Sequence, residues 1–174
     1  MTMTPRVRKL VLTAHITCSV GWLGAVAGFL ALSIAGMTSE EPQQVRAVYL
    51  AMELTTWYVI VPLSLASLLT GIVQALGSPW GLFRHYWVLI KFLMTLLATL
   101  ILLLHTQPIS LVADVATERA LSAGDLGSLR VQLVVDAGAA LLALLVTVTL
   151  SVYKPRGMTG YGRRRQRGQR AVAP

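Results

Sequence analysis

The chain has 174 residues, of which 55% are hydrophobic and only 13% are charged, and its formal net charge is +8. Soluble domains carry about 25% charged residues, so this composition excludes an ordinary water-soluble globule. The single cysteine, Cys18, excludes an intramolecular disulfide and any Cys-x-x-Cys site.

Four apolar segments, each long enough to cross a membrane, occupy most of the chain. They cover residues 10–36, 54–77, 86–106 and 131–153. A hydrocarbon layer of about 30 Å needs roughly 20 apolar residues in a helix that rises about 1.5 Å per residue. The first charge-free run exceeds the apolar core of a cleaved signal peptide, so we expect a retained span. The sequence predicts an all-α membrane domain over residues 1–153, an antiparallel bundle of four transmembrane helices.

Basic residues collect on one side of the predicted bundle. Of the 15 basic residues, only Arg46, Arg119 and Arg130 lie in the 37–53 and 107–130 connections, where six acidic residues gather. Basic residues in short loops favour the cytoplasmic side of a membrane. We therefore predict a multi-pass protein of a bacterial plasma membrane with both termini in the cytoplasm. Within the second acidic connection, Val112–Leu121 is expected to form a short surface helix.

Small residues in the first predicted span indicate a close helix contact. Gly24 and Gly28 form a GxxxG pattern, which lets two helix backbones approach each other in lipid. Such a pattern brings together either two helices of one chain or two helices of different chains. We favour packing within the monomer over dimerisation.

Three polar residues fall at a common depth near the predicted cytoplasmic face. His15, Gln74 and Lys91 come from three different spans, at about 5 to 10 Å from the inner ends of those spans. Ionisable groups at membrane depth are costly and mark functional sites by default. The sequence predicts an inner polar pocket from these residues. In the alternative interpretation, Lys91 extends its ammonium to the headgroups and His15 only hydrogen-bonds a neighbouring helix.

A second polar layer is predicted near the outer face. His105 of the third span and Asp136 of the fourth span share this level, with Glu53 and Arg130 at its rim. In the alternative interpretation, His105 is merely interfacial and Asp136 forms an ion pair or a helix-end hydrogen bond near Arg130.

The C-terminal residues 154–174 are strongly basic and are expected to form a disordered cytoplasmic tail. Arg163, Arg164, Arg165 and Arg167 lie just beyond the last span. Each such charge contributes about 1 kcal/mol next to an anionic leaflet, so anionic lipids are the expected partner. Nucleic acid is not expected, since the tail has no folded platform and almost no interleaved aromatic residue.

No catalytic or metal-binding motif is present in the sequence. It has no Walker loop, no HExxH and no GxSxG pattern, and its three histidines and one cysteine do not cluster. We therefore predict no metal site, and the sequence leans away from an enzyme.

Four stretches of the chain resemble a group of small, actinobacterial-type integral membrane proteins of unknown function. They are HITCSVGWLGA, PLSLASLLTGIVQALG, RHYWVLIKFLMTLLATLILLLH and SVYKPRGMTGYGRRRQ. More distantly, Trp87 and Lys91 followed by His105 on one helix are similar to HemJ-type protoporphyrinogen oxidases, and CopD-type membrane proteins share a comparable bundle. The HemJ resemblance implies that His15 and Lys91 match that family's histidine and lysine, and it makes haem b the possible cofactor.

Three functions are compatible with these features. The first is a membrane partner, sensor or scaffold without enzymatic activity, which we favour. The second is a haem-binding redox protein with His15 or His105 as axial ligand. The third is an ion or metal (copper) transporter that uses Lys91 and Asp136 as opposed charges. Four spans are few for a monomeric transporter, so this function requires a homo-oligomer.

Overall fold

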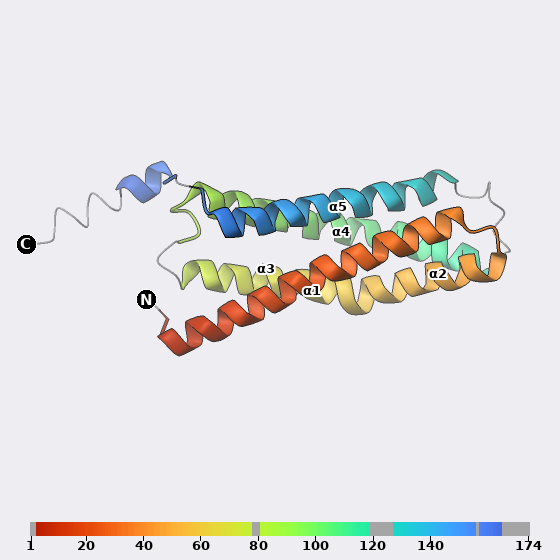
Figure 1. Cartoon of the computed structure of the whole chain (residues 1–174), viewed down its shortest axis with the longest axis horizontal. Helices are drawn as coiled ribbons and strands as arrows, with labels where there is room; N and C mark the ends of the chain where they lie inside the picture. The colour runs from red at the N-terminus through yellow and green to blue at the C-terminus, as the bar shows by residue number, and fades with distance from the viewer. Residues whose placement is uncertain (1–2, 78–80, 119–126, 156, 165–174) are drawn as a thin grey trace, which may run out of the picture.

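A computed structural model, which describes residues 3–77, 81–118, 127–155 and 157–164, shows a bundle of long helices (Figure 1). The elements in chain order are α1 (Pro5–Thr38), α2 (Pro42–Thr55), the π-helix η1 (Thr56–Ile60), α3 (Val61–Leu76), α4 (Tyr86–Glu118) and α5 (Gly127–Tyr153). Four helical stretches are long and apolar enough to cross a membrane, namely Pro5–Thr38, Pro42–Leu76, Tyr86–Gln107 and Gly127–Tyr153. The predicted all-α fold with four such helices is confirmed.

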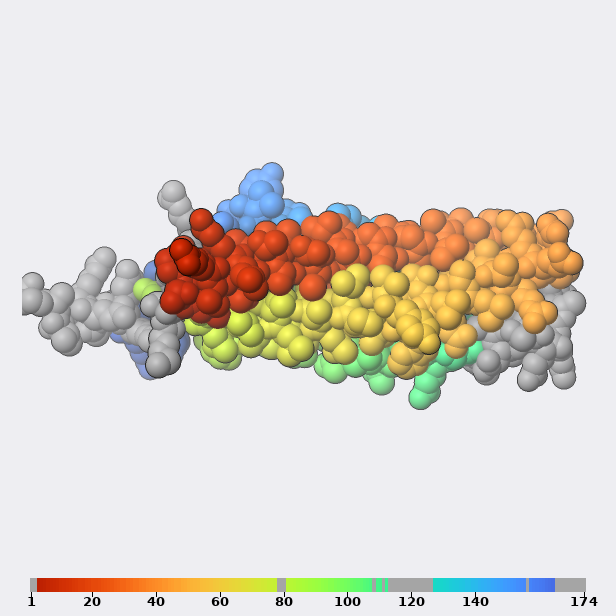
Figure 2. All heavy atoms as spheres, turned by 90° about the horizontal axis from the view of Figure 1, so that it is seen from below, coloured from red at the N-terminus to blue at the C-terminus, as the bar shows by residue number. Residues whose placement is uncertain are grey.

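The helices run up and down around a common axis. Helix α1 packs against α3 and α5, and α4 packs against α2, α3 and α5. Figure 2 shows α1 lying along the continuous α2–η1–α3 rod. The start of α1 and the end of α5 lie at one end of the bundle (Figure 1), which we call the N/C end, and the short α1–α2 connection lies at the opposite, far end.

The helices extend well beyond the apolar segments that predicted them. The predicted 37–53 connection is wrong, because α1 ends at Thr38 and α2 already begins at Pro42. Proline is well suited to the first turn of a helix, where its missing N–H has no intrahelical acceptor. At the other connection, α4 continues to Glu118, so the described part of the predicted Val112–Leu121 surface helix belongs to α4. The length of an apolar segment indicates the part of a helix that lies in the membrane core. The ends of the helix depend on capping residues and on packing.

A π-helical turn joins α2 to α3 in the middle of the second span. The N–H of Val61 reaches the carbonyl of Thr56, a spacing of five residues. Pro62 follows directly and lacks the N–H that a regular α-helix would use at its position. Such single π-turns are frequent at functional sites. Here the turn buries the side chains of Thr56 and Ile60 inside the bundle.

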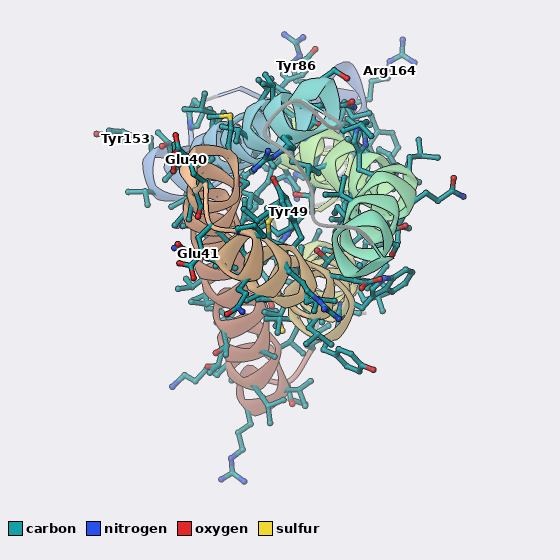
Figure 3. The ribbon with its side chains drawn as sticks, turned by 90° about the vertical axis from the view of Figure 1, so that its right-hand side faces the viewer. Glu40, Glu41, Tyr49, Tyr86, Tyr153 and Arg164 are labelled. Atoms are coloured by element: carbon teal, nitrogen blue, oxygen red, sulfur yellow. The ribbon has the colours of Figure 1, made fainter. Side chains whose placement is uncertain are left out.

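A buried arginine ties the far end together. Arg130, at the start of α5, is only 4% exposed. Its Nε donates to the Tyr49 hydroxyl at 2.9 Å, its Nη2 donates to the Gly36 carbonyl, and its guanidinium lies over the Tyr49 ring. Carbonyls in the last turn of a helix have no partner within the helix, so Arg130 caps α1. Figure 3 shows Tyr49 pointing into the bundle.

The sequence placed Arg130 at the rim of the outer polar layer, and the structure buries this side chain. Val45, Tyr49 and Met52 are the buried residues of α2, and Tyr49 contacts Arg130. The sequence suggested a loop in this region, and a loop would have left Arg130 in water. Because the segment is helical, one of its faces closes over the guanidinium.

Gly24 and Gly28 do not pack against another part of the described chain. Both are exposed, and a Cβ built on either would meet no atom within 4 Å. The predicted packing within the monomer is therefore wrong. Close approach occurs instead at Gly36, where a Cβ would lie 3.0 Å from Tyr49 Cζ, and at Gly71, where it would lie 3.1 Å from His15 Cε1.

The start of the basic tail is ordered, contrary to expectation. Thr159 donates its hydroxyl to the Phe83 carbonyl at 2.6 Å and its N–H to the Arg84 carbonyl at 3.1 Å. The same hydroxyl oxygen accepts the N–H of Gly162 and so caps the start of the helical turn over residues 160–164. These bonds hold the tail against the segment before α4. Arg163 and Arg164 are exposed on this turn, and Arg165 and Arg167 lie outside the described residues.

Substituting the glycines distinguishes these roles. Gly36→Ala pushes a Cβ against the immobilised Tyr49 ring, so we expect a loss of about 1–3 kcal/mol in the free energy of unfolding. Gly24→Ala and Gly28→Ala meet no neighbour and gain up to about 1 kcal/mol of helix propensity. Unfolding by SDS in mixed micelles measures all three. A loss in Gly28→Ala equal to that in Gly36→Ala would contradict this assignment.

The Arg130 contact is tested with Tyr49→Phe. Removing the hydroxyl leaves a buried, charged donor without that acceptor, so we expect the free energy of unfolding to fall by about 1–3 kcal/mol. Tyr58→Phe is the matched control, because Tyr58 is 76% exposed, and its effect should stay within about 0.5 kcal/mol. The same SDS titration, followed by circular dichroism, compares the two. Equal effects of the two variants would rule out a stabilising role for the contact.

Candidate functional site

An elongated cavity of about 370 Å³ lies between α1, η1, α4 and α5. Small side chains create it. On α5, Ala137, Ala140 and Ala143 line one wall, and Ala98 lines another wall on α4. Where alanines from neighbouring helices line a common space, the side chains are too short to fill it. The remaining wall is largely apolar and includes Phe29, Ile60 and Leu144.

The cavity reaches the outer surface of the bundle between α4 and α5. Leu97 and Ile101 of α4 and Ala139 of α5 line the cavity and are also exposed. These residues lie within two of the stretches long and apolar enough to cross a membrane. The opening therefore faces the hydrocarbon of a surrounding bilayer.

His105 and Asp136 form a pair in the cavity wall. Their Nε2 and Oδ2 atoms are 3.1 Å apart, which is an ion-pair distance, although the angle between the groups is not that of a hydrogen bond. His105 Nδ1 lies 2.9 Å from the Ile101 carbonyl, which can only accept, so Nδ1 carries a proton. The pair brings α4 and α5 into contact at this level.

The structure brings together the two residues of the predicted outer layer, His105 and Asp136. His105 lines a cavity, so it is not merely interfacial. Asp136 contacts His105, whereas Arg130 is engaged by Tyr49 and Gly36. Gln132 adds an amide nitrogen 3.5 Å from His105 Nε2.

A second group of polar side chains lies in the half of the bundle toward the N/C end. His15 Nδ1 is 3.1 Å from the Ser67 carbonyl and 3.2 Å from the Thr70 hydroxyl. Thr70 donates its own proton to the Ala66 carbonyl, so both partners of His15 accept and Nδ1 is the donor. Ser19 and Ser67 add a hydrogen bond of 2.8 Å between α1 and α3.

Lys91 is held inside the bundle in this layer. Its Nζ donates to the Ser151 hydroxyl of α5 at 2.7 Å, and Ser151 donates in turn to the Thr147 carbonyl at 2.7 Å. Lys91 therefore bonds to a partner within the protein. A lysine that only extended its ammonium to the headgroups would need no such partner. Gln74 of α3 is half-buried, and its Oε1 has no hydrogen-bond partner among the described residues.

The two histidines proposed as alternative haem ligands lie at different levels of the bundle. His15 contacts Ser67 of α3, and His105 lines the cavity together with Thr56 of η1. Ser67 and Thr56 are about 16 Å apart along the continuous α2–η1–α3 rod. His105 already directs Nδ1 to a carbonyl and Nε2 to Asp136, and His15 does not line the cavity. A histidine that donates Nδ1 to a carbonyl keeps the orientation usual for a metal ligand, so the haem site that the HemJ resemblance implies stays a prediction. Within the described ranges, no group of three or more His, Cys, Asp or Glu residues could hold a metal ion.

Two lining residues with polar atoms, Trp22 and Thr56, were not predicted as site residues. Trp22 of α1 is only 3% exposed and lines the cavity, and its indole Nε1 has no acceptor among the described residues. Thr56 of η1 is fully buried and donates to the Met52 carbonyl at 2.8 Å. The sequence signal for Trp22 was its helical spacing from His15 and Ser19, which places the three side chains on one face of α1. The π-turn that positions Thr56 was signalled only by Pro62.

A comparison of this chain with protein-family models, with curated proteins and with solved structures finds no match.

Proposed function

We propose that this chain is a multi-pass plasma-membrane protein that binds a lipid-soluble small molecule and acts as a sensor or partner protein, not as an enzyme. The observation that carries this proposal is the cavity between α1, η1, α4 and α5. Small-molecule sites in proteins are usually about 300–1,000 Å³, mainly apolar, and equipped with a few polar groups that orient the ligand. The volume and lining of this cavity match that description.

The position of the opening supports uptake from the bilayer. Leu97, Ile101 and Ala139 place the opening on the surface of two apolar helices. A molecule dissolved in hydrocarbon would pass between α4 and α5 without crossing water. Its apolar body would contact alanine and branched side chains, and the His105–Asp136 pair would orient a polar end.

The transporter alternative has less support from the geometry. It requires Lys91 and Asp136 to act as opposed charges. Lys91 is bonded to Ser151 toward the N/C end, and Asp136 contacts His105 closer to the far end. The two charges thus belong to different polar layers.

The charge distribution supports cytoplasmic termini. The N/C end carries Arg6, Arg8, Lys9, Arg84 and the basic tail, whereas the far end carries the acidic Glu40 and Glu41. Basic residues near span ends favour the cytoplasmic side. Arg163 and Arg164 are exposed at this end, where they would contact anionic headgroups.

Orientation is tested with single cysteines on a Cys18→Ser background. Glu40→Cys should react with a membrane-impermeant maleimide on intact cells, and Thr4→Cys should react only after permeabilisation. Both positions are exposed in the structure, so access depends on sidedness alone. The opposite labelling pattern would invert the proposed topology.

Ligand uptake is tested by filling the cavity with Ala140→Phe. A photoreactive undecane diazirine in proteoliposomes should label cavity residues such as Trp22 and Phe29, which are buried from lipid. In Ala140→Phe we expect this labelling to fall at least about fivefold, because the added ring occupies the cavity. Peptide mass spectrometry measures the labelling.

Ala27→Phe is the matched control, because Ala27 is an exposed residue of α1 outside the cavity lining. It should leave labelling of the cavity unchanged. Labelling confined to exposed leucines in the native protein would refute uptake into the cavity.

A further inference from the structure

The accessible polar side chains of the cavity lining are those of the His105–Asp136 pair. Trp22 Nε1 and Asp136 Oδ2 are closed off by the surrounding protein, and Thr56 is fully buried. The side chains of His105 and Asp136, in contrast, remain 30% and 37% exposed. A ligand in the cavity or at its opening therefore meets polar side-chain atoms at this pair.

Within the pair, Asp136 Oδ1 is an accessible acceptor without a protein donor. Oδ2 is the carboxylate oxygen that faces His105 Nε2, and it is the one that the protein closes off. Oδ1 is not closed off, and no donor among the described residues bonds to it. A carboxylate oxygen in apolar surroundings is costly without a donor. Oδ1 can obtain this donor from a ligand.

The place of Asp136 on α5 brings this carboxylate to the cavity and its opening. Asp136, Ala139, Ala140 and Ala143 share one face of the helix, and all four line the cavity. Ala139 is exposed where the cavity opens between α4 and α5. Asp136 lies about 14 Å along the helix from the start of α5. It is therefore at membrane depth, where lipid hydrocarbon offers no donor.

The route of entry decides the charge of the ligand. The opening faces hydrocarbon, and transfer of a charged group into hydrocarbon is strongly unfavourable. A hydroxyl group donates a hydrogen bond and remains neutral, whereas an ammonium group must carry its charge through the lipid. The rest of the wall, with residues such as Val26, Phe29 and Leu144, suits an aliphatic body.

We propose that the cavity takes a neutral, lipid-soluble alcohol with an aliphatic body, whose hydroxyl donates a hydrogen bond to Asp136 Oδ1. This inference rests on the proposed function and adds the chemical class of the ligand. Binding forms and breaks no covalent bond. The aliphatic body lies along the alanines of α5, and the hydroxyl lies at the His105–Asp136 pair.

The test compares 1-undecanol with its isomer decyl methyl ether in nanodiscs, at equal mole fractions in the bilayer. The two probes contain the same atoms, but the ether oxygen can only accept a hydrogen bond. Each probe competes with the photoreactive undecane for labelling of Trp22 and Phe29. We expect 1-undecanol to compete about fivefold better than the ether, which corresponds to one additional buried hydrogen bond. Undecylamine at the same mole fraction tests for a cationic ligand.

Two variants locate the hydrogen bond. Asp136→Leu removes the acceptor and introduces an apolar side chain, so the preference for 1-undecanol should disappear while both probes still compete. Gln132→Leu is the matched control, because Gln132 is an exposed residue one turn away on α5 and outside the cavity lining. It should retain the preference.

A second measurement keeps Asp136 and does not depend on the folding of Asp136→Leu. The double substitution Asp114→Asn and Asp125→Asn leaves Asp136 as the sole aspartate of the chain. With ¹³C at the aspartate carboxyl carbon, 1-undecanol should shift the Asp136 signal. Decyl methyl ether should shift the same signal less than half as far.

The outcomes separate the two proposals. Equal competition by 1-undecanol and the ether in the native protein, with equal carboxyl shifts, would overturn the alcohol assignment and leave uptake of a lipid-soluble molecule standing. Stronger competition by undecylamine than by 1-undecanol would overturn the assignment in favour of a cationic ligand. Failure of all three probes to reduce the labelling of Trp22 and Phe29 would overturn the proposed function as well.

Discussion

The hydrocarbon surroundings of this bundle impose the constraint on which the rest of its structure depends. Lipid offers no hydrogen-bond partner, so each polar group at membrane depth must be satisfied within the protein. The backbone meets this requirement in long helices. Side chains meet it in hydrogen bonds between helices, such as Ser19 with Ser67 and Lys91 with Ser151. The first bond joins α1 to α3, and the second joins α4 to α5.

The same constraint draws attention to buried polar groups that have no partner among the described residues. Trp22 Nε1 is a buried donor without an acceptor among the described residues, and it lines the cavity. Trp22 forms part of the wall of this space, and the small alanine side chains of α5 leave the space open.

The π-turn at Thr56–Ile60 connects the fold to this site. It shifts the helical register between α2 and α3, so that each half of the rod can present its own face to the bundle. The α2 half turns Tyr49 and Met52 inward and closes the far end around Arg130. The turn itself places Thr56 and Ile60 in the cavity wall. One local irregularity, required by Pro62, thus serves both stability and the site.

The sequence by itself determined the four apolar helices and the existence of two polar layers, because hydropathy and helical rise depend only on residue order. It placed His105 and Asp136 at one depth for the same reason. Only the tertiary structure decided which faces meet. Helix rotation turned Gly24 and Gly28 outward, α2 formed where a loop was expected and buried Arg130, and the start of the tail was anchored by Thr159. The cavity depends on side chains from four elements that lie far apart in the chain, and no single segment encodes their distances.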